Sequence, residues 1–304
     1  MITVNPQHPQ APPELVCPGC LGNLEAHGEA ATGALPHSLP TLACATCERV
    51  YSAEAGYLDF IGLTDDADSG ARGLGPRLMH SRVLAGVYEK LWRPFFVTVA
   101  SGGRPDYAGE LEHILHALEP ARDGIIADLG CGPGFTGRHL AATRHFGRVY
   151  GVDWSVPMLR RALAAHAPAL LLLRADVVRL PFARESLAGI HAGAALHVWP
   201  DPQSAIAEAA RVLRPGGVLV ASTFAHLPGA PGRTMRTMRT MRGIMGGFQA
   251  FSSARVFEAD ELAGMCRAHG LLDFTAQRRG ALIMFSATRG HAVTPIFTGK
   301  PGRA

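Results

Sequence analysis

Asp128-Leu-Gly-Cys-Gly-Pro-Gly134 is the stretch that decides the fold of this 304-residue chain. An apolar run over residues 124–129 leads into it and a helical pattern from Thr136 follows, which predicts a strand, a tight turn and a helix. The G-x-G-x-G spacing differs from the dinucleotide pattern G-x-G-x-x-G, and the loop lacks the Lys-Ser/Thr pair of a phosphate-binding P-loop. Asp128 would repel a pyrophosphate, so a ligand that carries an ammonium group fits better.

Two further acids follow the next two predicted strands. Asp153 ends the apolar run over residues 149–153, and Asp176 comes just past the run over residues 170–174. A carboxylate at Asp153 can accept both hydroxyls of an unphosphorylated ribose, and Asp176 can accept a hydrogen bond from an adenine amino group. Helix capping explains one or two such acids but not three at successive strand ends. The pattern therefore predicts a nucleoside site at the edge of the sheet.

The surrounding sequence extends this pattern in both directions. Between residues 106 and 288, short apolar runs alternate with helical patterns, which is typical of βαβ units and a parallel sheet. Ser155 is the expected N-cap of one helix, and Pro215-Gly216-Gly217 is expected to end another. The expected strands are residues 124–129, 149–153, 170–174, 187–192 and 218–224 with a closing hairpin over 271–277 and 281–288, and the expected helices are 110–118, 136 onward, 155–165, 202–213 and 257–269.

Four of the six cysteines form two tight pairs, Cys17-Pro-Gly-Cys20 and Cys44-Ala-Thr-Cys47. Two C-x2-C knuckles with 23 residues between them suit a tetrahedral four-cysteine zinc site, because each knuckle presents two thiolates from one turn. Four cysteines saturate the metal, so a structural role is expected. The alternative is a set of paired redox cysteines.

These motifs together resemble those of class I S-adenosylmethionine-dependent methyltransferases of the methyltransferase type 11 kind. The resemblance rests on the glycine turn, Gly151-Val-Asp153, Arg174-Ala-Asp176 with Leu180-Pro-Phe182, and the Arg-Val-Leu-Arg-Pro-Gly-Gly run that ends at Gly217. It implies an α/β fold: a seven-stranded Rossmann-like sheet of order 3-2-1-4-5-7-6, with a small N-terminal zinc ribbon and S-adenosylmethionine across the sheet edge.

The resemblance also implies roles for individual residues. Gly130, Gly132 and Gly134 line the methionine part, and Asp153 holds the ribose. Trp154 and Met158 flank the adenine, and Asp176 and Val177 bind its edge. The full expected set of cofactor residues is Asp128, Gly130, Cys131, Gly132, Gly134, Asp153, Trp154, Met158, Asp176, Val177 and Ala194.

A narrower resemblance comes from the order of segments. A four-cysteine ribbon ending in Tyr57-Leu-Asp-Phe60, a helix with Tyr88-Glu-Lys-Leu-Trp-Arg93 and the block His191-Ala-Gly-Ala-Ala-Leu-His-Val-Trp-Pro200 are similar to uncharacterised plant plastid methyltransferases and their bacterial relatives. More distantly, the arrangement resembles the 23S rRNA guanine-N1 methyltransferases, which carry an N-terminal zinc ribbon. Residues 191–224 resemble the plastid group more closely, which counts against an RNA substrate.

Candidate catalytic residues follow the fourth strand and precede the domain. His197 is a possible base if the acceptor is a phenol, a hydroxyl or an acidic carbon, and a structural role is the alternative. Tyr88, Trp92 and Arg93 lie on an amphipathic stretch, where they either pack against the sheet or, by the resemblance, form a lid over cofactor or acceptor. Trp199 is placed to form an aromatic wall.

Three functions remain open on these grounds. The first is methyl transfer to a small lipophilic or aromatic molecule. The second is an rRNA or tRNA base methyltransferase, in which the ribbon and an Arg-rich segment contact phosphates; the arginines are Arg233, Arg236, Arg239 and Arg242, and the last three belong to a Thr-Met-Arg repeat over residues 234–242. The third is a non-catalytic or non-methylating scaffold that uses the same fold. The repeat is either a basic lid or a surface-loop expansion.

The domain organisation follows from these assignments. We expect a disordered lead over residues 1–13, the ribbon over 14–60, linker and lid helices over 61–107, the methyltransferase domain over 108–290 and a flexible tail over 291–304. The net charge of +4 is compatible with an anionic partner but diagnostic of none. The N-terminus lacks a signal-peptide pattern, so a cytoplasmic location is expected, and the apolar run over residues 167–173 is too short to span a bilayer.

Overall fold

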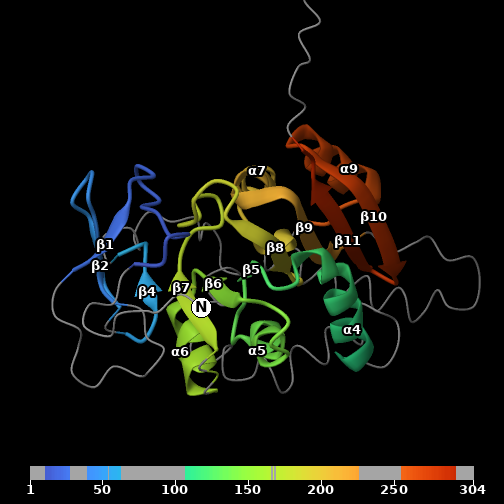
Figure 1. The fold of residues 1–304 in the computed structure, drawn as a ribbon. Helices are drawn as coiled ribbons and strands as arrows, with labels where there is room; N and C mark the ends of the chain where they lie inside the picture. Colours follow the sequence, from blue (N-terminus) through green and yellow to red (C-terminus); the bar gives the residue numbers. More distant parts are fainter. Residues whose placement is uncertain are drawn as a thin grey trace, which may run out of the picture.

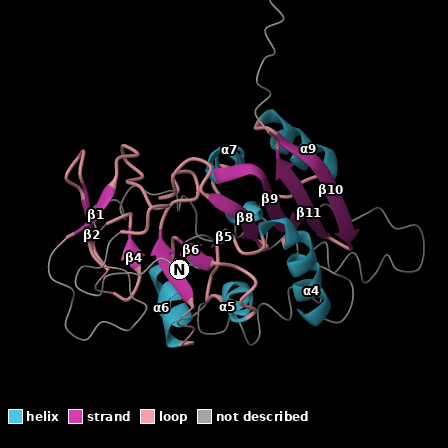
Figure 2. Ribbon diagram, viewed as in Figure 1, coloured by secondary structure: helices cyan, strands magenta, loops and turns pink. Residues whose placement is uncertain are grey.

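The computed structural model describes residues 11–27, 40–53, 55–62, 107–165, 167, 169–225 and 255–291. In these ranges one central sheet carries helices on both faces, which gives three layers (Figures 1 and 2). Tyr88, Trp92, Arg93 and the repeat over residues 234–242 lie outside the described residues, so their lid roles stay predictions. In the described part of the chain, no helix is long and apolar enough to cross a membrane.

The central sheet confirms the predicted strand order and adds one strand to it. Its order is β10-β11-β9-β8-β5-β6-β7-β4, and the seven strands from β5 to β11 reproduce the order 3-2-1-4-5-7-6. The eighth strand, β4, comes from the cysteine-bearing segment, by which we mean residues 14–60, and pairs in parallel with β7. The strands are β4 (Leu58–Asp59), β5 (Ile125–Leu129), β6 (Arg148–Asp153), β7 (Leu170–Arg174), β8 (Leu187–Ala192), β9 (Leu213–Phe224), β10 (Leu271–Arg279) and β11 (Leu282–Arg289).

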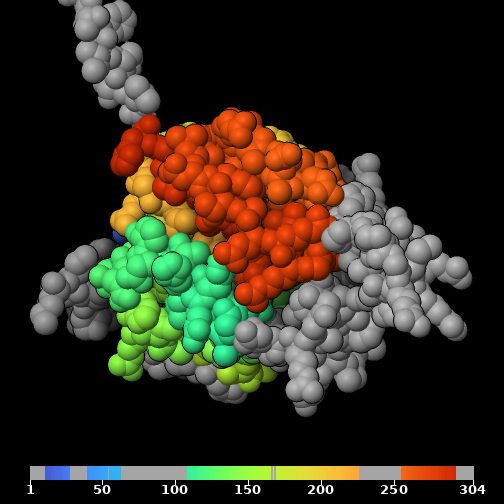
Figure 3. Space-filling view, turned by 90° about the vertical axis from the view of Figure 1, so that its right-hand side faces the viewer, coloured from blue at the N-terminus to red at the C-terminus, as the bar shows by residue number. Residues whose placement is uncertain are grey.

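Helices cover the two faces of the sheet. One face carries α4 (Tyr107–Ala117), α5 (Phe135–Ala142) and α6 (Val156–Ala164), and the other carries α7 (Pro202–Val212) and α9 (Ala259–Ala268) (Figure 1). On the side of the molecule in Figure 3, the orange and red C-terminal segment lies directly above the green segment that begins with α4.

Most apolar side chains of the cysteine-bearing segment pack on the same face as α7 and α9, while Tyr57 packs on the face that carries α5 and α6. The segment forms a small antiparallel sheet of β1 (Leu24–Ala26), β2 (Leu42–Cys44) and β3 (Val50–Tyr51), seen in blue beside β4 in Figure 1. Apolar side chains of this segment and of the large sheet belong to one continuous core, in which Tyr150 and Phe182 are fully buried with ring centroids 5.2 Å apart. Each such aromatic side chain contributes about 2 kcal/mol by burial.

A buried carboxylate ties the segment to the start of β6. Glu14 is 5% exposed, forms an ion pair with Arg148 and accepts a hydrogen bond of 2.7 Å from the hydroxyl of Tyr150. The backbone of the segment joins in, since the N–H of Val16 donates to the carbonyl oxygen of Pro181 at 3.0 Å. The segment is therefore attached by charge, backbone and apolar contacts together.

Two local predictions are confirmed only in part. Ser155 occupies the N-cap position of α6, but its side chain makes no capping bond, and its Oγ is buried without a hydrogen-bond partner among the described residues. The helix α7 does not stop at the Pro-Gly-Gly run. It ends at Val212 and the chain enters β9 at once, at Leu213, ahead of the predicted strand start at Val218. A register shift between Leu187 and Gly189 on the neighbouring strand accommodates this irregular start.

Candidate functional site

The glycine turn adopts the left-handed backbone conformation that favours glycine. Gly130, Gly132 and Gly134 have φ values of +69°, +55° and +78°, a region in which side chains are strained. A Cβ atom added to Gly130 would lie 2.9 Å from the Cβ of Ala195. The helix α5 begins directly after Gly134, so the N–H groups of its first turn face the open end of this loop without intrahelical partners.

Asp128 lies inside the protein, in β5 just before the turn. It is 2% exposed, and its Oδ1 lies 2.7 Å from Nδ1 of His191, which is also buried. The two residues face each other in the register of β5 and β8. Oδ2 of Asp128 is buried and has no hydrogen-bond partner among the described residues. His191 is thus a buried, hydrogen-bonded core residue of β8, whose partner could not be read from the sequence.

Asp153 lies at the tip of β6, where its carboxylate closes the glycine turn. Oδ2 accepts the N–H of Gly132 at 2.8 Å, and Oδ1 accepts the N–H of Ser155 at 2.7 Å. Burial raises the pKa of Asp153 to about 6, and the nearby charge of Asp128 adds to this rise, while the two N–H donors oppose it. Each oxygen keeps a second lone pair, so the carboxylate can also accept the hydroxyls of a ribose.

The expected adenine contacts gather at the same edge of the sheet. Trp154 directly follows β6, and Met158 is buried on α6. Asp176 follows β7, where its Oδ1 accepts the N–H of Val178 at 3.1 Å and its side chain is about a quarter exposed. Val177 packs against the core. The structure therefore brings the ends of β5, β6 and β7 together as the sequence predicts.

The loop after β8 lies against the glycine turn. Ala194 has a φ of +49°, and its N–H donates to Oγ of Ser222 at 2.8 Å, which fixes this unusual backbone. The indole nitrogen of Trp199 lies 3.7 Å from the position that a Cβ atom on Gly130 would take. Ala195 and Trp199 thus lie beside the turn, and Ala194 directly precedes Ala195 in the same loop.

His197 is buried in this loop. It is 6% exposed, and its ring contacts that of Phe224 edge-on with centroids 4.4 Å apart. Burial lowers the pKa of His197 to about 3, so the imidazole is neutral at physiological pH. A group with so low a pKa is a weak base, which favours a packing role over the predicted role in proton transfer.

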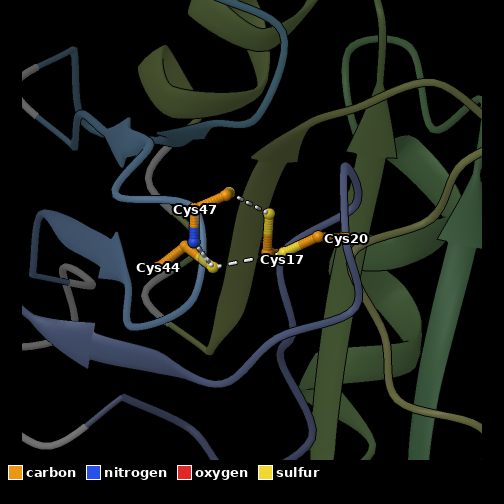
Figure 4. A group of neighbouring side chains, drawn as sticks. All are labelled: Cys17, Cys20, Cys44 and Cys47. Carbon is orange, nitrogen blue, oxygen red and sulfur yellow. Dashed lines mark hydrogen bonds between the residues drawn. The ribbon is translucent and has the colours of Figure 1, made fainter.

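The four paired cysteines form one cluster, shown in Figure 4. Their sulfur atoms all lie within 4.8 Å of one another, with 3.6 Å between Cys17 and Cys47 and 3.4 Å between Cys20 and Cys44. A tetrahedral zinc ion with Zn–S bonds of about 2.3 Å requires sulfur atoms about 3.8 Å apart. A disulfide requires about 2.05 Å. The spacing therefore fits a metal and not a disulfide.

The chemistry around the sulfur atoms also fits a metal. The N–H groups of Thr46 and Cys47 both point at Sγ of Cys44, at 3.4 Å each. Burial alone would raise the pKa of Cys44, but these two donors together with the side chains of Cys20 and Cys47 lower the pKa to about 6. A thiolate at neutral pH is the form that binds zinc.

Comparisons with known proteins agree with this geometry. Residues 127–221 match the family described as Methyltransferase domain. An uncharacterised chloroplastic methyltransferase of Arabidopsis thaliana is 36% identical over 256 residues, which cover 81% of this chain and 70% of the relative. A second such Arabidopsis protein is 31% identical over 285 residues, covering 90% and 77%. Demethylmenaquinone methyltransferase of Thermobifida fusca is 30% identical over 152 residues, covering 49% and 56%.

Solved structures share the fold. Phosphoethanolamine N-methyltransferase 2 of Haemonchus contortus, in complex with phosphomonomethylethanolamine and S-adenosylhomocysteine, superimposes with a TM-score of 0.55 at 14% identity. The match covers 74% of this chain and 61% of that one.

Fold and site together define a class I S-adenosylmethionine-dependent methyltransferase. The chain belongs to the methyltransferase family that includes the two Arabidopsis proteins, and it is an enzyme that uses S-adenosylmethionine. The expectation of a cytoplasmic location is wrong by the same comparison, because both of these relatives are named chloroplastic.

Proposed function

We propose that this enzyme transfers a methyl group from S-adenosylmethionine to a small, uncharged lipophilic or aromatic acceptor, with a quinol ring as the leading example. The observation that carries the proposal is the loop over residues 193–200, which lies against the glycine turn and contains no Lys, Arg, Asp or Glu. Its histidine, His197, is neutral, and Trp199 offers an aromatic surface. A quinone methyltransferase among the partial relatives gives independent support.

The cofactor contacts that we propose follow the geometry of the strand ends. The glycines and the first turn of α5 would hold the methionine part, with Asp128 and Cys131 supporting the turn and Ala194 beside it. Asp153 would hold the ribose, whose two hydroxyls match its two oxygens. Trp154 and Met158 would flank the adenine, and Asp176 and Val177 would meet its edge.

The bound cofactor supplies a methyl group on a positively charged sulfur, which is already activated for displacement. The chain itself has to orient the acceptor in line with that methyl group and to exclude water. We propose that the Cys17, Cys20, Cys44 and Cys47 thiolates hold a structural zinc ion, since four sulfur ligands leave no open position for a substrate.

A transfer assay with tritium-labelled S-adenosylmethionine tests the proposal. The purified, zinc-loaded protein would be offered a demethylated quinol, a small carboxylic acid and total RNA in parallel. We expect label in the solvent-extractable quinol, and we expect none with Asp153→Ala, which lacks the proposed ribose contact. Label in RNA, with binding that weakens steeply as salt rises, would support the nucleic-acid alternative instead. Absence of S-adenosylmethionine binding by calorimetry would contradict the proposed cofactor site.

A further inference from the structure

Three charged residues lie in one row across the ends of three parallel strands. The register of β4 and β7 places Asp59 opposite Arg174, and the register of β7 and β6 places Arg174 opposite Asp153. Backbone hydrogen bonds join the row, from the N–H of Phe60 to the carbonyl oxygen of Arg174 at 2.8 Å and from the N–H of Ala175 to that of Asp153 at 3.3 Å. The cysteine-bearing segment thus ends one strand away from the proposed ribose contact.

The side chain of Arg174 connects the two sides of this row. It is 4% exposed, and its Nη1 donates to Oδ2 of Asp59 at 3.0 Å. Its Nε donates to the carbonyl oxygen of Trp154 at 3.1 Å. A buried guanidinium is stable only when it is paired and hydrogen-bonded, so these contacts hold it in place.

Asp59 is itself held in a fixed orientation. Its Oδ1 accepts the N–H groups of Ile61 and Gly62, at 2.9 and 3.1 Å, which leaves Oδ2 directed at the arginine. The charge pair spans 115 positions of the sequence, and its acidic member comes from the segment that carries the cysteine cluster.

One peptide plane links the arginine to the proposed ribose contact. The carbonyl of Trp154 and the N–H of Ser155 belong to the same planar peptide unit. Arg174 holds the oxygen end of that unit, and the N–H end donates to Oδ1 of Asp153 at 2.7 Å. Any tilt of this plane would therefore change the direction of the Asp153 carboxylate.

We propose that Asp59 is a positioning residue of the cofactor site: it orients Arg174, and Arg174 fixes the peptide between Trp154 and Ser155 that directs the Asp153 carboxylate. The cysteine-bearing segment is then a part of the cofactor site and not only a module attached to it. This role rests on the proposed contact between Asp153 and the ribose.

The chain provides a matched control at the end of β6 opposite to Asp153. Glu14 also belongs to the cysteine-bearing segment, is also buried, and pairs with Arg148 at the start of β6. Arg148 and Asp153 are the first and last residues of this strand, a distance of about 17 Å. Glu14→Gln therefore weakens the attachment of the segment without reaching the cofactor site.

The experiment compares Asp59→Asn, Arg174→Lys and Glu14→Gln in the full-length, zinc-loaded protein. For each variant, the Kd of S-adenosylhomocysteine is measured by calorimetry and the melting temperature by ligand-free thermal denaturation. A lysine at position 174 keeps a positive charge that can pair with Asp59. It lacks the planar guanidinium, whose second N–H donor binds the Trp154 carbonyl oxygen in the wild-type protein. We expect Asp59→Asn and Arg174→Lys to raise the Kd about tenfold. Glu14→Gln should lower the melting temperature and leave the Kd within about twofold of wild type.

A second measurement separates positioning from general destabilisation. The hydrogen bond from the N–H of Ser155 lowers the pKa of Asp153. A tilted peptide weakens this hydrogen bond, so the pKa of Asp153 rises further. The pH midpoint of ligand binding should then move upward in Asp59→Asn and stay unchanged in Glu14→Gln. Equal losses of affinity in Asp59→Asn and Glu14→Gln, or unchanged affinity in Asp59→Asn, would overturn the positioning role of Asp59. Failure of the wild-type protein to bind the ligand would overturn the proposed ribose contact, and the positioning role with it.

Discussion

Lowering the pH from 7 to 5 should weaken cofactor binding through a single carboxylate. Asp153 has its pKa raised to about 6 by burial, while most aspartates titrate near 4. Protonation removes an acceptor from the group that we propose to hold the ribose hydroxyls. The amine and the carboxylate of S-adenosylhomocysteine keep their charges between pH 5 and 7, so the ligand itself does not titrate there.

The size of the effect follows from linkage. If the ligand binds the ionised form, the apparent Kd scales as 1 + 10^(pKa − pH), which is about 1.1 at pH 7, about 2 at pH 6 and about 11 at pH 5. Affinity should therefore fall about tenfold over this range. The free energy of unfolding of the ligand-free protein should change in the opposite direction to the affinity, rising as the pH falls. Because the folded pKa lies above the unfolded one, this carboxyl stabilises the ligand-free protein below pH 4, and up to about 3 kcal/mol is lost as the pH rises through 6.

Calorimetric titration at several pH values provides the assay, with Asp153→Asn as the control. The chain contains 14 histidines, a residue type whose unperturbed pKa lies in this window, so the wild-type curve alone would be ambiguous. The amide does not titrate, and the variant should bind weakly at every pH with a nearly flat profile. Parallel profiles for the two proteins would refute the assignment of the pH dependence to Asp153.

Three further predictions follow from the site. Gly130→Ala should abolish measurable S-adenosylhomocysteine binding in calorimetry, since its Cβ would lie 2.9 Å from Ala195 at a φ of +69°. Cys44→Ser should remove bound zinc, measured by atomic absorption, and lower the melting temperature, because a structural zinc ion contributes to folding; zinc retained at the wild-type level would exclude Cys44 as a ligand. His197→Phe should change the transfer rate by less than about tenfold, whereas a loss of about a hundredfold or more would restore the base role.

The strands of the large sheet and the cysteine cluster could be predicted because their signals are local. Each motif marks the end of one strand, and the family resemblance supplies the order in which such strands pair. The thiolates of Cys17 and Cys20 come from one turn, and those of Cys44 and Cys47 from another, so spacing alone indicates a metal site. The glycine turn was predictable for the same reason, since the three glycines follow a strand directly.

The contacts that could not be predicted all join distant parts of the chain. Strand β4 has only two residues, Leu58 and Asp59, too few to show any periodicity. The pairing of Asp59 with Arg174 spans 115 positions, and that of Asp128 with His191 spans 63. Only the assembled sheet brings such residues together. The low pKa of His197 was missed too, because burial cannot be read from the loop sequence.

The shared core has a practical consequence for how the gene can be cut. A truncated protein that starts at residue 107 would contain the matched methyltransferase region. It would lack the apolar side chains of the cysteine-bearing segment that share a core with Tyr150 and Phe182. It would also leave β7 as an unpaired edge strand, open to pairing with other chains. We expect such a truncated protein to aggregate on expression. In size-exclusion chromatography, a chain cleaved between residues 62 and 107 should instead elute as one species, with its two fragments still bound to each other.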